Sequence, residues 1–114
     1  MNENLEEALE RYLKLMDEEA YFEAHEVLEE GWHPLRLRDD PLANLAKGLI
    51  NAAICFEHIK RDKKNAHKKA QKVLASFERH KHLCSKGIDH EDLFRLAIEK
   101  IESLKEEYPY LLRP

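Results

Sequence analysis

One imidazole and one carboxylate occupy a stretch of the chain that otherwise has the pattern of a buried helix face. In residues 21–33, His25 and Glu29 are four positions apart, so a helix places their side chains on adjacent turns. At about 100° per residue, both fall on the arc that also holds Phe22 and Trp32. Ionisable groups are rarely buried without a partner, so this pair is the first candidate for chemistry.

A divalent metal would suit the pair, because imidazole nitrogens and carboxylate oxygens are common ligands of Zn, Mn, Fe or Ni. Two ligands do not complete a site, and we expect His58 to be the third. Its helix should pack against the helix of His25, since the loop that joins them is short. The predicted metal ligands are therefore His25, Glu29 and His58.

Open positions on such a metal would hold a water molecule and would suit hydrolysis. The catalytic residues would then be Glu29 and His25, with Glu29 or the metal-bound water as the base. Trp32 is expected to form the floor of the pocket, and Asn51 to bind a water or orient a ligand from behind the metal.

Two other interpretations of the same residues stay open. Glu29 could accept a hydrogen bond from His25 or His58, which would make a closed polar network in a non-catalytic module that binds protein or nucleic acid. The pair could also serve a small-ligand site without a metal. Beyond a metal no cofactor is indicated, because the sequence contains no glycine-rich phosphate loop.

A second group of possible metal ligands lies later in the chain. His80, His82 and Cys84 alternate, and His90 follows closely. Zinc ligands usually come in short-spaced pairs, so this alternation is a weak signal and we expect a solvated loop.

Apolar residues recur at helical spacing in five segments, approximately residues 4–17, 21–33, 41–60, 65–79 and 89–107. Pro34 is expected to end the second helix, and Asp40 and Asp89 to cap the third and fifth. The apolar tail, residues 108–114, should pack on the bundle or on a partner. We therefore predict one all-α domain over residues 1–114, a compact bundle of about five helices with a packed C-terminal tail.

The third of these helices is apolar on most sides, and we expect it to be the most buried. A narrow polar seam remains along it, formed by Asn44, Lys47, Asn51 and His58. Gly48 lies beside that seam. Glycine costs about 1 kcal/mol against alanine inside a helix, so its presence predicts the close approach of another helix.

The composition favours a cytoplasmic helical protein. Of 114 residues, 37% are charged and three are glycine, which argues against a turn-rich β fold. No apolar run approaches the roughly 20 residues that span a bilayer, and the acidic N-terminus lacks the apolar core of a signal peptide. Cys55 and Cys84 are expected to be reduced thiols.

The charges are unevenly distributed along the chain. Residues 1–30 carry eleven acids and two bases, whereas residues 60–81 carry nine bases and two acids. This asymmetry could steer an anionic partner or pair two protomers in a homodimer. We prefer two solvated faces, because the basic segment lacks the interleaved aromatics of a nucleic-acid platform. The expected partner is an unidentified small molecule or protein.

The segment YFEAHEVLEEGW, residues 21–32, resembles the signature of a family of small helical bacterial and archaeal proteins, the domain of unknown function number 309. That signature is His-x-x-x-Glu-x-x-Trp/Tyr. KGLIN at residues 47–51, His58 and GID at residues 87–89 are similar to further family segments, although the family more often has Gln at Asn51. The resemblance implies about five helices and a metal suggested at the His/Glu motif, with no established activity.

Overall fold

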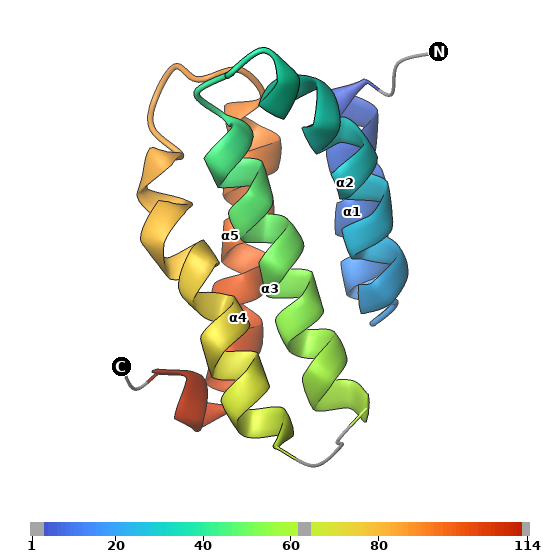
Figure 1. The fold of residues 1–114 in the computed structure, drawn as a ribbon, viewed down its shortest axis with the longest axis vertical. Helices are drawn as coiled ribbons and strands as arrows, with labels where there is room; N and C mark the ends of the chain where they lie inside the picture. The colour runs from blue at the N-terminus through green and yellow to red at the C-terminus, as the bar shows by residue number, and fades with distance from the viewer. Residues whose placement is uncertain (1–3, 62–64, 113–114) are drawn as a thin grey trace.

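The structure, a computed structural model, describes residues 4–61 and 65–112. Within these ranges the chain forms helices and no strand, which confirms the predicted all-α class (Figure 1). In chain order the elements are α1 (Leu5–Asp17), α2 (Tyr21–Leu37), α3 (Ala43–Arg61), α4 (Ala66–His80), the 3-10 helix η1 (Lys81–Leu83), α5 (Glu91–Glu106) and the 3-10 helix η2 (Pro109–Leu112).

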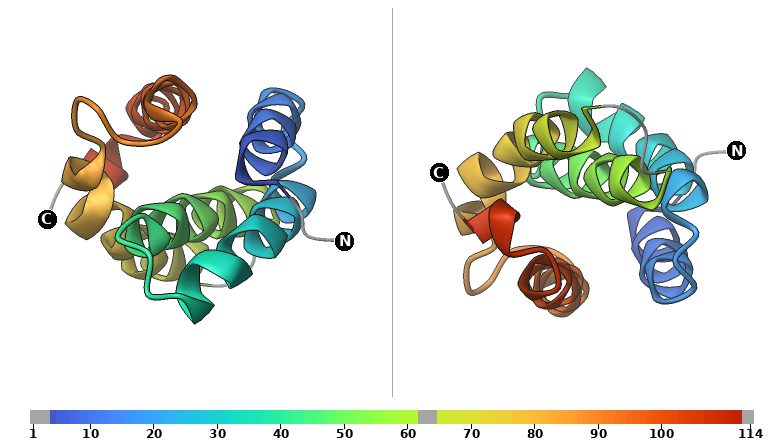
Figure 2. Two further views of the ribbon diagram at one scale, coloured as in Figure 1. Left: turned by 90° about the horizontal axis from the view of Figure 1, so that it is seen from above. Right: turned by 90° about the horizontal axis from the view of Figure 1, so that it is seen from below.

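The helices follow one another around a common core. α2, α3 and α4 lie side by side in one layer, and α1 and α5 lie behind them, as the end-on views show (Figure 2). α5 closes the bundle by packing against α1 and contacting α3. α3 is thus covered from several sides, as its apolar pattern predicts.

A buried polar group with a hydrogen-bond partner lies between α1 and α3. Tyr12 of α1 is fully buried, and its hydroxyl donates a hydrogen bond of 2.7 Å to the backbone carbonyl of Leu49. Burial raises the pKa of this phenol far above its ordinary value, so it remains a donor. The bond fixes the position of α1 along α3.

Two glycines allow neighbouring helices to approach closely. A Cβ atom on Gly48 would lie 3.1 Å from the Cα of Phe77 in α4, which confirms the predicted close approach. A Cβ atom on Gly31 would lie 2.8 Å from the Cβ of Ala8 in α1. Gly31 therefore lets α1 pack against α2.

The expectation that α2 ends at Pro34 is wrong. The helix continues to Leu37, and Leu35 beyond the proline is 2% exposed. A proline removes one backbone donor and bends a helix, and the burial of Leu35 compensates for that loss. Past Pro34 the ribbon leans toward the start of α3 (Figure 1).

Two predicted helix starts are also displaced. Asp40 accepts a 2.9 Å hydrogen bond from the backbone N–H of Leu42, so it caps a turn that precedes α3. Asp89 does not cap α5, because His90 directly before the helix has a left-handed backbone with φ of 59°. Glu91 instead accepts a 2.8 Å bond from the N–H of Gly87 and closes this loop.

The C-terminal tail packs on the bundle over its described part, residues 108–112, as predicted; residues 113–114 lie outside the described ranges. Leu111 of η2 is buried. Gln71 of α4 donates a 2.7 Å hydrogen bond to the carbonyl of Tyr110, and the ring of His67 stacks on the Tyr110 ring at 4.3 Å.

Four charged side chains join α5 to the end of α4. Lys105 is 5% exposed and pairs with Glu78 and with Glu102, the latter at 2.8 Å. Lys81 lies 2.7 Å from each of the same two carboxylates. Burial by itself raises the pKa of Glu102, but hydrogen bonds from Lys105 and Lys81 outweigh it and hold that pKa below its ordinary value.

Replacing Gly31 by alanine tests the packing of α1 on α2. Overpacking costs about 1–3 kcal/mol, more than the helix-propensity gain of up to about 1 kcal/mol, so Gly31→Ala should lower the free energy of unfolding. In an Ala8→Gly background the opposing Cβ is gone, and the same change should be neutral or stabilising. Urea unfolding measures both, and an equal loss in both backgrounds would contradict the packing.

The charge cluster predicts a specific dependence of stability on pH. Because the pKa of Glu102 is lowered by folding, its contribution is complete above its unfolded pKa of about 4.3 and disappears as pH falls through the folded pKa. Glu102→Gln should therefore reduce the difference between the free energies of unfolding at pH 7 and at pH 3, as measured by urea unfolding. Glu106→Gln, at an exposed position of α5, is the control and should leave that difference intact.

Candidate functional site

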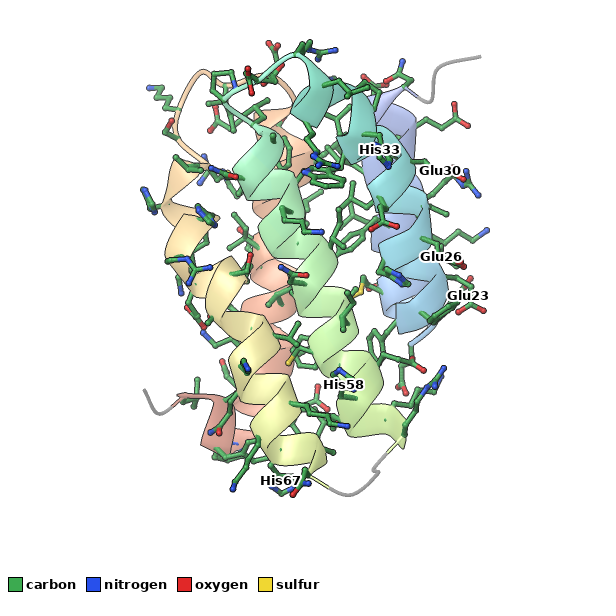
Figure 3. All side chains as sticks on the ribbon, viewed as in Figure 1. Glu23, Glu26, Glu30, His33, His58 and His67 are labelled. Atoms are coloured by element: carbon green, nitrogen blue, oxygen red, sulfur yellow. The ribbon has the colours of Figure 1, made fainter. Side chains whose placement is uncertain are left out.

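His25 of α2 and His58 of α3 line the same pocket. It has a volume of about 240 Å³, and Phe22, Ile54, Glu57 and Arg61 complete its wall. The two imidazoles are half-buried and come from facing helices, at the end of α3 that Figure 3 marks with His58. The structure thus brings together two of the three predicted metal ligands.

A backbone contact fixes the orientation of His25. Its Nδ1 lies 2.5 Å from the carbonyl oxygen of Phe22, and a carbonyl can only accept, so Nδ1 donates. Neutral His25 therefore carries its hydrogen on Nδ1 and leaves Nε2 as an acceptor. The imidazole also meets the Phe22 ring edge-on, with 4.9 Å between ring centroids.

The rim of this pocket holds an ion pair. Glu57 accepts a 2.5 Å hydrogen bond from Nε of Arg61, which offsets the charge of the carboxylate. The guanidinium carbon of Arg61 lies 5.9 Å from the ring centroid of Phe22. With that acid paired, the remaining polar groups of the wall are the two imidazoles.

Trp32 lies in a different pocket. Nζ of Lys47 is 4.4 Å from its ring centroid, so α2 and α3 meet there as well. Because the helices are antiparallel, residue 25 faces the region of residue 58, and residue 32 faces residue 47. Glu29 and Asn51 fall between these two levels, half-buried, and line neither pocket.

The three predicted metal ligands do not assemble. Within residues 4–61 and 65–112, no group of three or more His, Cys, Asp or Glu side chains could hold a metal ion. Nδ1 of His25 donates to the carbonyl of Phe22 in the preceding turn of α2, so this nitrogen is not available to a metal. The side chains of His80, His82 and Cys84, which are also described, likewise form no group that could hold a metal ion.

The buried thiol of α3 is chemically quiet. Burial raises the pKa of Cys55 to about 12, opposed weakly by Lys105. Cys55 therefore stays protonated near neutral pH and is a poor metal ligand. Both cysteines are free thiols, as predicted.

Sequence reasoning missed the residues that complete the wall around the histidines. Glu57 and Arg61 are an acid and a base at i and i+4 on α3, a spacing that predicts an ion pair beside His58. Phe22 is 44% exposed because it forms one side of the pocket. On the outer edge of α2, by contrast, Glu23, Glu26 and Glu30 point away from α3 (Figure 3).

Comparisons with other proteins identify one family. The sequence model of the family described as Domain of unknown function (DUF309) matches residues 9–70, more than half of the chain. No curated protein and no solved structure matches it. The matched region includes all of α2 and α3 and therefore both pockets between them. Among the described residues no helix has the length and apolarity needed to cross a bilayer.

The contact between His25 and the Phe22 carbonyl predicts that neutral His25 adopts one tautomer, with its hydrogen on Nδ1. Long-range ¹H–¹⁵N NMR at a pH where the imidazoles are neutral should show the hydrogen of His25 on Nδ1 in nearly all molecules. His82 is exposed and serves as the control, since no contact within the described residues selects its tautomer. A His25 signal with the hydrogen on Nε2 would contradict this geometry.

Proposed function

The chain belongs to the DUF309 family, and from the pocket between α2 and α3 we propose that it binds a small organic ligand through His25 and His58. The single observation that carries this proposal is that imidazoles from two helices line one pocket. Ligand sites commonly combine an apolar wall with a few convergent polar groups between packed helices.

The wall chemistry indicates a small carboxylate with an apolar body. Phe22 and Ile54 offer apolar contact surface. Neutral His58 can donate one N–H to a carboxylate, whereas His25, whose Nδ1–H is engaged by the Phe22 carbonyl, donates from Nε2 only when it is protonated. Arg61 adds a cation at the rim, although Glu57 already pairs with it. A planar acid of the size of benzoate would place its ring on Phe22 and its carboxylate near the imidazoles.

A divalent metal is the second candidate. It is favoured by the bond from Nδ1 of His25 to a carbonyl, because metal-binding histidines usually donate their other N–H to such a group. His25 and His58 would supply two nitrogen ligands, and water or a bound carboxylate would supply the rest. In hydrolysis the base would then be metal-bound water, because Glu29 does not line the pocket.

Titration with benzoate tests the main proposal. Amide signals of residues around Phe22, His25 and Ile54 should shift and saturate in ¹H–¹⁵N spectra. His58→Ala should weaken binding about tenfold or more, because a charge-assisted hydrogen bond contributes about 1.5–3 kcal/mol. His82→Ala, at an exposed position of η1, should leave the affinity unchanged.

Zn²⁺ titration by calorimetry distinguishes a metal site from a carboxylate site. A metal site requires that His25→Ala and His58→Ala each abolish a 1:1 binding event that His82→Ala retains. If benzoate gives no saturable shift and Zn²⁺ binding is the same in all variants, the pocket has no binding role and the histidines are structural.

A further inference from the structure

A second pocket lies at the opposite end of the seam between α2 and α3. It has a volume of about 450 Å³ and is open to solvent. Its wall comes from the last turns of α2, the connecting turn and the first turns of α3. The residues that carry its chemistry are Trp32, Arg36, Asp39, Asp40, Asn44 and Lys47.

Two cations of this wall share one aromatic ring. Nζ of Lys47 lies 4.4 Å from the ring centroid of Trp32, and Cζ of Arg36 lies 5.4 Å from the same centroid. Within the described parts of the chain, neither cation has a carboxylate at ion-pair distance. Both cations also line this pocket, so an anion bound in it would be attracted by two positive charges that lack a carboxylate partner.

The acids of the same wall differ in their contacts. The carboxylate of Asp40 is engaged, since it lies 3.2 Å from the guanidinium of Arg38 and accepts the N–H of Leu42 at 2.9 Å. Asp39 is exposed and has a left-handed backbone with φ of 52°. No ion pair engages Asp39 among the described residues, so its charge would oppose an anion in the pocket.

We propose that this pocket binds a doubly charged phosphoryl group between Arg36 and Lys47. A guanidinium and an ammonium together match the charge of a phosphate monoester near neutral pH, and a guanidinium can donate two parallel hydrogen bonds to it. Asn44 supplies a further amide donor on the same wall. This site is separate from the histidine pocket and does not depend on a ligand there.

Trp32 supplies the readout, because it is the only tryptophan of the chain and both cations lie beside its ring. Inorganic phosphate and methyl phosphate are titrated separately while tryptophan fluorescence is recorded, with sodium chloride at equal ionic strength as the reference. Amide signals of residues 43–47 are followed by NMR in parallel. The two arms distinguish a free-phosphate site from a phosphate-monoester site.

Three substitutions give the expected pattern. Lys47→Met and Arg36→Gln should each weaken binding several-fold, up to about fivefold, as expected when one exposed charged pair is lost. Lys68→Met removes an equal charge from an exposed site on α4 and should leave affinity unchanged. Asp39→Asn should strengthen binding, and asparagine tolerates the left-handed backbone at that position.

The outcomes are mutually exclusive. Saturation by phosphate or methyl phosphate, weakened at residues 36 and 47 and strengthened at residue 39, supports the site. The proposal is overturned if neither probe moves the fluorescence or the amide signals beyond the chloride reference. It is equally overturned if the Lys47, Arg36 and Lys68 variants, each shown by circular dichroism to be folded, bind alike.

Discussion

The burial of α3 on most of its sides is the constraint on which the rest of the structure depends. A helix in that position must keep most of its contact faces apolar, and Gly48 shows how closely α4 approaches it. A polar group inserted from another helix, the hydroxyl of Tyr12, is accommodated by a hydrogen bond to the carbonyl of Leu49. Three polar residues of α3, Asn44, Lys47 and His58, form a strip that lines the two pockets between α3 and α2.

That strip determines where chemistry can occur. Because α2 runs antiparallel to α3, side chains on the facing sides of the two helices meet one turn after another along their length. His25 and His58 lie at one end of this contact, and Trp32 and Lys47 lie at the other. The two ends differ in character. One offers imidazoles on an apolar wall, and the other offers cations beside an indole, so the same packing produces two pockets with different preferences.

The sequence predicted the helices and their burial well, because periodicity reports which face is apolar. It placed some helix ends wrongly, since Pro34 is overridden by the burial of Leu35, a tertiary effect that no local signal contains. His25 and His58 were expected to meet because the connecting loop is short. Glu29 was grouped with them but lines neither pocket, and spacing gives the face of a helix but not the direction of a side chain along it. The pocket at Trp32 depends on the register between helices, which periodicity leaves open.

The register of α2 against α3 determines both pockets, and proton NOE measurements between side chains of the two helices test it most directly. This register predicts cross-peaks between the His25 ring and the Ile54 methyl groups, and between the Trp32 ring and the ε-methylene of Lys47. Cross-peaks that connect Trp32 with His58 instead, or the absence of both predicted contacts in the folded protein, would contradict it.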